Sequence, residues 1–223
     1  MSEFDQYASS WHQPDGPMGA LHQIHPVRMA FIKPFLSKEP LRILDAGCAG
    51  GLISLDLAAL GHQVTGIDLS LAMIQQAEIK SKEQDLSIDW IQSPIQSFQS
   101  EQNFDMIICS EVLEHIDEPL SALQHLISML APEGTLIVST INRTLNAFIS
   151  AIIGAEYLFN IVPKGTHRFD GLIDSRQLIP FVEKEGLSLS RLSGISYNPL
   201  SKHAQLTRDT SVNFILAAKR PKA

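Results

Sequence analysis

The sequence contains an apolar run that ends in a cluster of small residues, Leu41-Arg42-Ile43-Leu44-Asp45-Ala46-Gly47-Cys48-Ala49-Gly50-Gly51. Residues 52–60 then have helical spacing, and Gly61 ends them. This order predicts a strand, a tight turn and a helix, and the small side chains let the turn approach a ligand closely. Dinucleotide-binding domains and plain tight turns use such glycine-rich segments too, so the turn alone does not identify the ligand.

Strands and helices alternate after this turn. Gln63 to Asp68 reads as a second strand, and Ser70 can cap the helix that follows. Further strands are expected at 86–92, 104–109 and 135–141, with a helix at about 119–130. The alternation predicts an α/β fold with a doubly wound, mostly parallel sheet of seven strands that binds ligands at the carboxyl ends of its strands.

The two ends of the chain add to this core. Residues 1–40, with a helical pattern at about 24–36, form an N-terminal helical extension that we expect to cover the cofactor. Residues 143–170 read as a helical insertion and loop after the fifth strand, followed by a helix capped by Asp174 or Ser175. Two β-like runs, 188–197 and 210–218, are expected to close the sheet as an antiparallel pair. With 223 residues, of which 44% are hydrophobic, we expect a single domain over residues 1–223.

Composition narrows the class of protein. Seventeen Lys and Arg against 24 Asp and Glu give a net charge of −7, which disfavours a nucleic-acid partner. The two cysteines lack metal-binding spacing, and the N-terminus lacks a signal-peptide pattern. These features predict a cytoplasmic protein.

Two acidic residues point to the chemistry of the cofactor. Asp68 lies at the end of the second strand, where a carboxylate can accept both hydroxyls of a ribose, as nicotinamide proteins also do. The turn opens with Asp45 and has no third glycine at the spacing of a pyrophosphate fingerprint. A carboxylate there suits a cofactor that carries an ammonium and a sulfonium better than one that carries phosphates. The pair therefore favours S-adenosylmethionine.

A short acidic turn follows the fourth strand, Glu111-Val112-Leu113-Glu114-His115. Positions i, i+3 and i+4 of a helical turn share one face, so Glu111, Glu114 and His115 are candidate metal ligands near the methyl donor. Two hard oxygen ligands favour Mg²⁺, while the imidazole also permits Mn²⁺, Fe²⁺ or Zn²⁺. The alternative is that Glu111 and His115 simply pair on a solvated turn.

These motifs, taken in chain order, resemble the signature motifs of class I methyltransferases. Further segments are similar to the ubiquinone-biosynthesis O-methyltransferase family over nearly the whole chain. They are Ala8-Ser9-Ser10-Trp11, Leu21-His22, Pro26-Val27-Arg28, Gly154-Ala155-Glu156-Tyr157, Val162-Pro163-Lys164-Gly165-Thr166-His167 and Tyr197-Asn198-Pro199.

The resemblance implies a set of residues that bind S-adenosylmethionine. They are Arg28 at the methionyl carboxylate, Gly47 and Ala49 at the methionyl part, Asp68 and Leu69 at the ribose, Ser93 and Ile95 beside the adenine, and Ser110 at the end of the fourth strand. The chain departs from the family's pattern at Ala49, where glycine is usual, at His12, where tryptophan is usual, and at His25, where asparagine is usual. In addition, Pro94 has no N–H to offer an adenine nitrogen.

The resemblance also implies a divalent cation, Mg²⁺, at the acidic turn and a polyprenyl phenol or catechol as the acceptor. We expect His115 and His167 to take part in catalysis, His167 as a further ligand or as the acceptor of the phenolic proton. Apolar side chains crowd residues 145–159. Core packing is one account of this segment, and the alternative is that it forms an apolar mouth for a polyprenyl tail or rests peripherally on a membrane surface. The basic loop 163–168 could meet anionic headgroups there. A ubiquinone-biosynthesis complex is a further expected partner.

Two other functions compete with this hypothesis. A Glu-x-x-Glu-His turn also fits another metal-dependent small-molecule or RNA-end O-methyltransferase, although the acidic balance argues against RNA. From a different class, the chain could be a non-catalytic scaffold that binds the cofactor, with Ala49 and Pro94 marking decay of the site.

Overall fold

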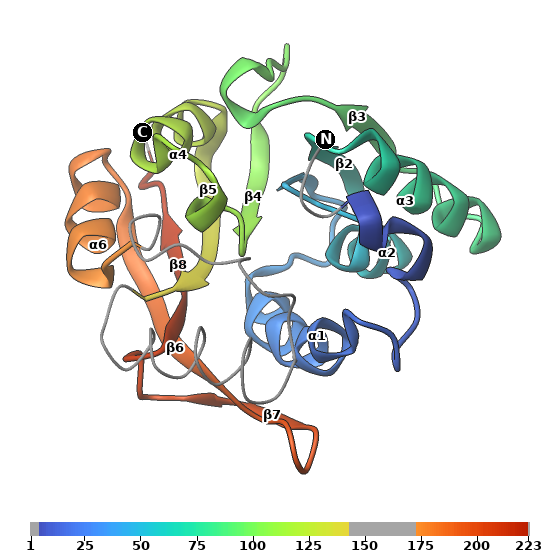
Figure 1. Cartoon of the computed structure of the whole chain (residues 1–223). Coiled ribbons are helices and arrows are strands. Elements are labelled where there is room, and N and C mark those ends of the chain that lie inside the picture. The colour runs from blue at the N-terminus through green and yellow to red at the C-terminus, as the bar shows by residue number, and fades with distance from the viewer. Residues whose placement is uncertain (1–4, 143–172, 223) are drawn as a thin grey trace.

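The computed structural model describes residues 5–142 and 173–222 (Figure 1). Its strands are β1 (Arg42–Ala46), β2 (Gln63–Asp68), β3 (Asp89–Gln92), β4 (Phe104–Ser110), β5 (Leu130–Ile141), β6 (Ser188–Asn198), β7 (His203–Thr207) and β8 (Asn213–Lys219). Its α-helices are α1 (Gly19–Ile32), α2 (Leu52–Ala59), α3 (Leu71–Glu83), α4 (Pro119–Ser128) and α6 (Ser175–Lys184). The helical insertion predicted at residues 143–170 lies outside the described residues. So does His167, for which a catalytic role is predicted.

All of these strands join one sheet, in the order β3-β2-β1-β4-β5-β8-β6-β7. Strands β1 to β5 pair in parallel, whereas β8 pairs antiparallel with both β5 and β6. The predicted α/β fold and the closing antiparallel pair are therefore confirmed.

The sheet has eight strands rather than the seven predicted. The additional strand, β7, pairs only with β6, at the outer edge of the sheet. Its sequence, His203-Ala204-Gln205-Leu206-Thr207, has no run of large apolar residues, because an edge strand of this kind is not buried on both faces. The apolar pattern that identifies the other strands is therefore absent here.

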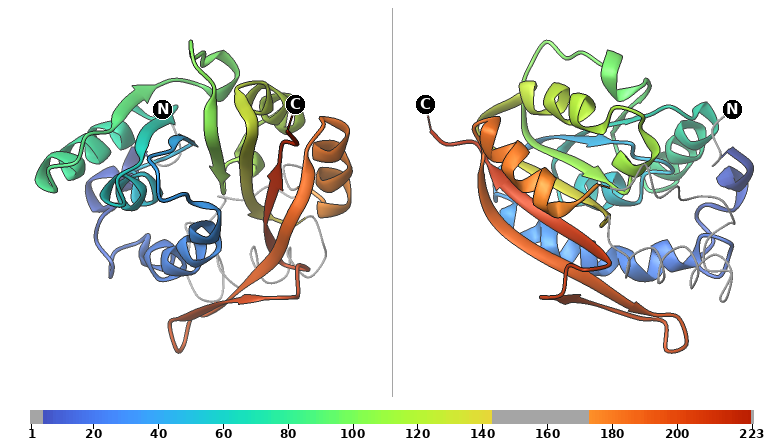
Figure 2. Two further views of the ribbon diagram at one scale, coloured as in Figure 1. Left: turned by 180° about the vertical axis from the view of Figure 1, so that it is seen from behind. Right: turned by 60° about the vertical axis from the view of Figure 1, so that its left-hand side comes forward.

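Alternate residues of the central strands supply two hydrophobic clusters, one on each face of the sheet. On β4, Ile107 and Cys109 pack with residues of α4 and α6, while Met106 and Ile108 pack with residues of α1 and α2. This alternation follows from the two-residue period of a strand. Figure 2 shows helices on both sides of the twisted sheet.

The helix starts follow from local capping. Ser70 accepts a hydrogen bond from the Met73 amide at the start of α3, and Asp174 accepts one from the Arg176 amide at the start of α6. The first helix differs from the prediction, because α1 begins at Gly19 and ends at Ile32. Pro34 lies in the short 3-10 turn Lys33–Phe35 that follows, whereas Pro26 is accommodated within α1 itself.

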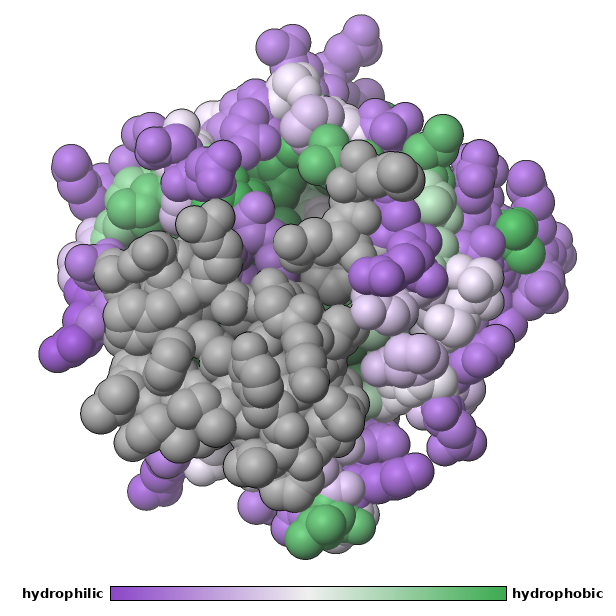
Figure 3. All heavy atoms as spheres, in the orientation of Figure 1, coloured by the Kyte–Doolittle hydropathy of each residue, from purple (hydrophilic) through white to green (hydrophobic). Residues whose placement is uncertain are grey.

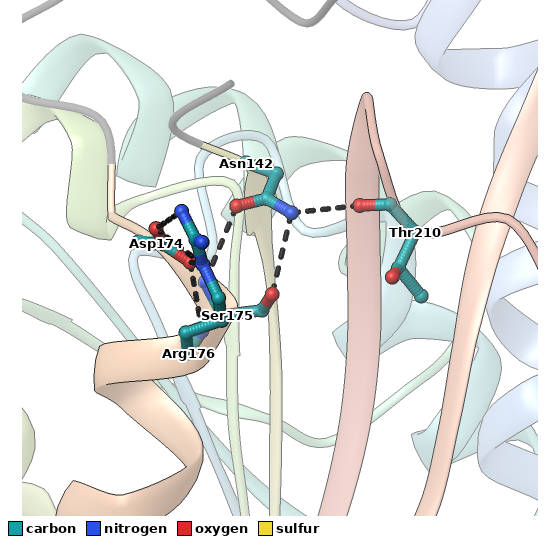
Figure 4. A network of polar contacts seen from close by, with 5 residues as sticks. All are labelled: Asn142, Asp174, Ser175, Arg176 and Thr210. Carbon is teal, nitrogen blue, oxygen red and sulfur yellow. Dashed lines mark hydrogen bonds and ion pairs between the residues drawn. The ribbon is translucent and has the colours of Figure 1, made fainter.

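A polar network joins the carboxyl end of β5 to two other segments (Figure 4). The side-chain amide of Asn142 donates to the Thr210 carbonyl oxygen (2.8 Å) and to the Ser175 hydroxyl (3.3 Å). Its side-chain oxygen accepts a hydrogen bond from the Ser175 amide (3.2 Å). Asn142 thereby holds the start of α6 beside the end of β5.

In the described part of the chain, no helix combines the length and apolar character needed to cross a membrane. Outside the residues drawn in grey, most of the molecular face in Figure 3 is hydrophilic, with hydrophobic residues in small groups.

Candidate active site

The strand order reverses at β1, which lies between β2 and β4. In open α/β sheets, ligands bind beyond the carboxyl ends of the strands at such a reversal. The small-residue turn follows β1, Asp68 ends β2, and the acidic turn follows β4. The topology therefore brings the three segments predicted from the sequence to the same edge of the sheet.

The small-residue turn has a backbone that favours glycine. Gly47, Ala49 and Gly51 have left-handed φ values of 78°, 46° and 84°. A methyl group on Gly47 would lie 2.3 Å from a side-chain carbon of Val112, so the small-residue turn contacts the acidic turn directly. Because an L-residue is strained in the left-handed region, Ala49 occupies a position better suited to glycine.

Asp68 is bound to the same turn. Its Oδ2 accepts a hydrogen bond from the Ala49 amide (2.9 Å), and its Oδ1 accepts one from the Ser70 amide (2.8 Å). Burial raises the pKa of the Asp68 carboxyl, and the backbone hydrogen bonds oppose that rise. Each carboxylate oxygen can accept more than one hydrogen bond, so the side chain can still bind hydroxyl groups.

The predicted adenine and ribose residues lie next to Asp68. The Ser93 amide donates to the Asp68 carbonyl oxygen (3.0 Å), and the Gln92 side chain donates to the Leu69 carbonyl oxygen (3.2 Å). Leu69 is 62% exposed although it is large and apolar, whereas Ile95 is buried. An exposed apolar side chain beside a carboxylate is compatible with a surface that a ligand covers.

Asp45 places a second acid behind the turn. It is only 2% exposed and accepts a hydrogen bond from the Ser54 hydroxyl (2.6 Å). Burial raises the pKa of the Asp45 carboxyl to about 6, and the nearby Asp68 carboxylate adds to the rise. Two acids this close to the turn favour a cationic ligand over a phosphate.

Arg28 reaches the site from α1. Its side chain is largely buried, and its Nη2 lies 3.5 Å from Oε1 of Glu111. Its Nε is buried and has no hydrogen-bond partner among the described residues. The structure therefore places a cation with a free donor beside the acidic turn.

Glu111 is held firmly by β5. Its amide donates to the Ser139 carbonyl oxygen (2.8 Å), and its Oε1 accepts a hydrogen bond from the Ser139 hydroxyl (2.9 Å). The Ser139 hydroxyl also contacts that of Ser110 (2.8 Å), so the predicted cofactor residue at the end of β4 belongs to the same network. Glu111 has a φ of 56°, a strained conformation for a residue other than glycine.

Glu114 is a buried acid that interacts electrostatically with Glu111. Its Oε2 accepts a hydrogen bond from the Thr140 hydroxyl (2.8 Å), while its Oε1 has no partner among the described residues. Burial raises the pKa of the Glu114 carboxyl, and the neighbouring Glu111 carboxylate raises it further. The two predicted carboxylates thus lie together.

His115 follows Glu114 on the same turn but differs from it in burial. Residues 113–115 form a 3-10 turn, in which residues three apart share a face and the next is rotated away. Glu114 is consequently buried and His115 is exposed. Within residues 5–142 and 173–222, no three His, Cys, Asp or Glu side chains are arranged to hold a metal ion, and the set of Glu111, Glu114 and His115 stays a prediction.

The N-terminal extension packs on the small-residue turn. A methyl group on Gly50 would lie 2.1 Å from a ring carbon of the buried Trp11. The Ser70 hydroxyl donates to Asp5 in the 3-10 helix Asp5–Ser10 (2.5 Å). Burial lowers the pKa of the neighbouring His12. The extension thus covers the turn from outside.

Ser139 and Thr140 are site residues that the sequence analysis missed. Both are fully buried near the end of β5 and bind the two glutamates. Hydroxyl side chains at adjacent, buried positions of an apolar strand are the signal that could have identified them.

Cys48 and Cys109 are buried free thiols, and burial raises the pKa of each.

A surface hollow of about 730 Å³ lies elsewhere, between the end of α3, β3 and the start of β4. Arg42, Lys82 and Trp90 contribute to its lining, and none of the predicted site residues that the structure describes does. This hollow is therefore separate from the candidate site.

The family model that matches this chain and two proteins similar to it are all described as methyltransferases. A family model described as a methyltransferase domain matches residues 20–190. The chain is 39% identical over 225 residues to a ubiquinone biosynthesis O-methyltransferase of Xylella fastidiosa (strain M23), covering 100% of this chain and 92% of that protein. It is 38% identical over 216 residues to the protein of that name from Coxiella burnetii (strain Dugway 5J108-111), covering 96% of this chain and 92% of the relative.

Two solved structures share the fold. Magnesium protoporphyrin IX methyltransferase from Synechocystis PCC 6803 with bound SAH matches with a TM-score of 0.73 and 22% identity, covering 97% of this chain and 94% of the other. The N-methyltransferase NodS from Bradyrhizobium japonicum WM9 in complex with S-adenosyl-L-homocysteine matches with a TM-score of 0.65 and 18% identity. The match covers 99% of this chain and 100% of the NodS chain.

Proposed function

Because the chain belongs to the ubiquinone biosynthesis O-methyltransferase family, we propose that it methylates a hydroxyl group of a polyprenyl phenol or catechol with S-adenosylmethionine as donor. The observation that carries the proposal is the direct contact of three segments at one edge of the sheet. The small-residue turn binds Asp68 through Ala49 and touches Val112 of the acidic turn through Gly47. We propose that this site belongs to one catalytic domain over the whole chain.

The donor side of the reaction falls to the small-residue turn and its neighbours. Arg28 would bind the methionyl carboxylate, and Asp68 would accept hydrogen bonds from the ribose hydroxyls. Asp45 lies behind the turn and would stabilise the positive charge of the ammonium and sulfonium groups. Leu69, Ser93 and Ile95 would flank the rest of the adenosine, with Ser110 at the end of β4. A donor held by these residues would present its methyl group toward the acidic turn.

The acceptor side falls to the acidic turn. The acceptor oxygen would form a bond to the methyl carbon while the carbon–sulfur bond breaks. The electron pair of the broken carbon–sulfur bond would stay on sulfur to give S-adenosylhomocysteine. The hydroxyl proton would pass to a base, for which His167 is the candidate predicted from the sequence. Alignment of oxygen, carbon and sulfur is the protein's main contribution to such a single displacement.

A divalent cation, Mg²⁺ above all, is part of this proposal. The carboxylates of Glu111 and Glu114 offer hard oxygen ligands, and the buried Oε1 of Glu114 has no protein partner among the described residues, so they fit such an ion. The ion would lower the pKa of an acceptor hydroxyl. The catalytic roles of His115 and of His167, which lies outside the described residues, remain predictions.

The polyprenyl tail is proposed from the sequence and from the relatives. The apolar residues at 145–159 suit a lipid tail and a peripheral contact with a membrane surface, but they lie outside the described residues. We also propose that the protein associates with other ubiquinone-biosynthesis proteins. Its proposed location is the cytoplasm, either free or bound peripherally at the inner face of the membrane.

The test is transfer of a labelled methyl group from S-adenosylmethionine to short-tailed phenols and catechols, with and without chelator. Glu114→Ala should abolish transfer, while Glu118→Ala, which changes an exposed acid at the start of α4, should leave it unchanged. Full activity of Glu114→Ala would defeat the acceptor-side role. Calorimetry that detects S-adenosylhomocysteine binding in a protein that transfers no methyl group to any acceptor would favour the non-catalytic scaffold. Transfer to RNA ends but to no phenol would favour the RNA alternative.

A further inference from the structure

We propose that Glu111 is a positioning residue for the cofactor: it holds Arg28 in place for the methionyl carboxylate, in addition to facing the acceptor. The inference rests on the proposed function, in which Arg28 binds that carboxylate. It assigns to the acidic turn a part in donor binding that is independent of any metal.

The ion pair between Arg28 and Glu111 joins the proposed donor-binding residues to the acidic turn. Arg28 comes from α1 in the N-terminal part of the chain, and Glu111 follows β4. Their side chains are only 11% and 26% exposed, and Nη2 of Arg28 lies 3.5 Å from Oε1 of Glu111. A partly buried guanidinium without a counter-charge would be costly, so Glu111 compensates the charge of Arg28 before the cofactor arrives.

Glu111 is suited to this role because it does not move freely. Its amide and its Oε1 are both bound by Ser139 of β5. Its left-handed φ of 56° shows that the surrounding structure imposes its conformation. A carboxylate anchored in this way defines where the guanidinium lies.

Arg28 retains donors for a second carboxylate. The contact with Glu111 involves Nη2, while Nε is buried and has no hydrogen-bond partner among the described residues. A guanidinium binds a carboxylate best through two parallel N–H donors, and its planar shape lets it contact two acids along different edges. The geometry therefore fits an arginine held on one edge by Glu111 and offered on another to the cofactor.

The experiment is calorimetry in the presence of a chelator, with no acceptor, on the full chain. Two ligands are compared: S-adenosylmethionine and decarboxylated S-adenosylmethionine, which lacks only the carboxylate. Glu111→Gln keeps the size of the side chain and removes its charge. We expect it to weaken binding of S-adenosylmethionine by roughly threefold to thirtyfold, within the range for residues coupled in one ion-pair network, and to leave binding of the decarboxylated ligand within about twofold.

Three controls sharpen the test. Glu118→Gln should bind both ligands as the unchanged protein does. Arg28→Met should remove the preference for the carboxylate, and adding Glu111→Gln to Arg28→Met should weaken binding no further, because Glu111 acts through Arg28. Thermal unfolding of each variant reports whether the fold is intact.

Several results would overturn the inference. They are an unchanged affinity of Glu111→Gln for S-adenosylmethionine, an equal loss for both ligands, and a tighter affinity, which would mean that Glu111 competes with the cofactor's carboxylate. If the unchanged protein bound neither ligand, the proposed function would fail and this inference with it. If it bound both and only the variant behaved otherwise than expected, the proposed function would stand.

Discussion

Replacing Asp45 with asparagine is expected to stabilise the ligand-free protein near neutral pH and to weaken cofactor binding. Asp45 lies at the end of β1, is 2% exposed, and accepts a hydrogen bond from the Ser54 hydroxyl. Asparagine has nearly the same shape and can accept that hydrogen bond, so the substitution removes mainly the charge.

The magnitude follows from the pKa of the buried acid. Burial raises the pKa of Asp45 from its ordinary value of 3.8 to about 6, so between these values the unfolded state binds fewer protons than the native state. The stabilising contribution of the protonated form is thus fully present below about pH 4 and is lost as the pH rises through about 6. At about 1.4 kcal/mol per pKa unit, the ionised carboxylate costs the native state about 3 kcal/mol above that window.

The assay is urea unfolding of both proteins at a series of pH values. The difference in free energy of unfolding, variant minus original, should be near zero at about pH 4 and should approach about 1–3 kcal/mol at about pH 7. Calorimetry near neutral pH should show cofactor binding weakened about tenfold or more, because the cationic groups lose a counter-charge. Asp89→Asn, at an exposed position on β3, is the matched control and should change neither quantity.

A stability difference that does not vary with pH would refute the electrostatic reasoning, since a change of packing alone does not depend on protonation. A loss of stability at neutral pH would refute it as well.

Three further substitutions test the site. Ala49→Gly should stabilise the protein by about 0.5–1 kcal/mol in thermal unfolding, because glycine relieves the left-handed φ of 46°; a decrease in stability would contradict the assigned strain. Gly50→Ala should cost about 2 kcal/mol or more and shift the fluorescence of Trp11, because the added methyl meets that ring; effects of Gly50→Ala and Trp11→Ala that simply add would argue against the contact. Asp68→Asn should weaken cofactor binding about tenfold in calorimetry, because the ribose hydroxyls lose a charged acceptor, and an unaltered affinity would remove Asp68 from the site.

Local patterns in the sequence were sufficient to predict most of the parallel sheet. The strand Gln63–Asp68 and the Ser70 cap after it occur where predicted, because both depend on neighbours within a few residues. Strand boundaries were less predictable: β3 begins at Asp89 and not at residue 86, and β5 begins at Leu130 and not at residue 135. These ends depend on the length of the neighbouring strand, which local patterns do not contain.

The polar partners of the acidic turn could not be predicted in the same way. Ser139 lies opposite Ser110 because β4 and β5 pair in one particular register. Only that register brings the Ser139 hydroxyl to Glu111 and the Thr140 hydroxyl to Glu114.

The order of strands and helices, the small-residue turn and the acid at the end of β2 could all be read from the amino-acid sequence, because each is a local pattern or a residue at a strand end. That Glu111 meets Arg28, and that Glu114 is buried while His115 is exposed, follows from tertiary packing alone. The reason is that side chains from α1, β4 and β5 meet through the packing of distant segments, and a short turn can orient its residues in more than one way until that packing selects one.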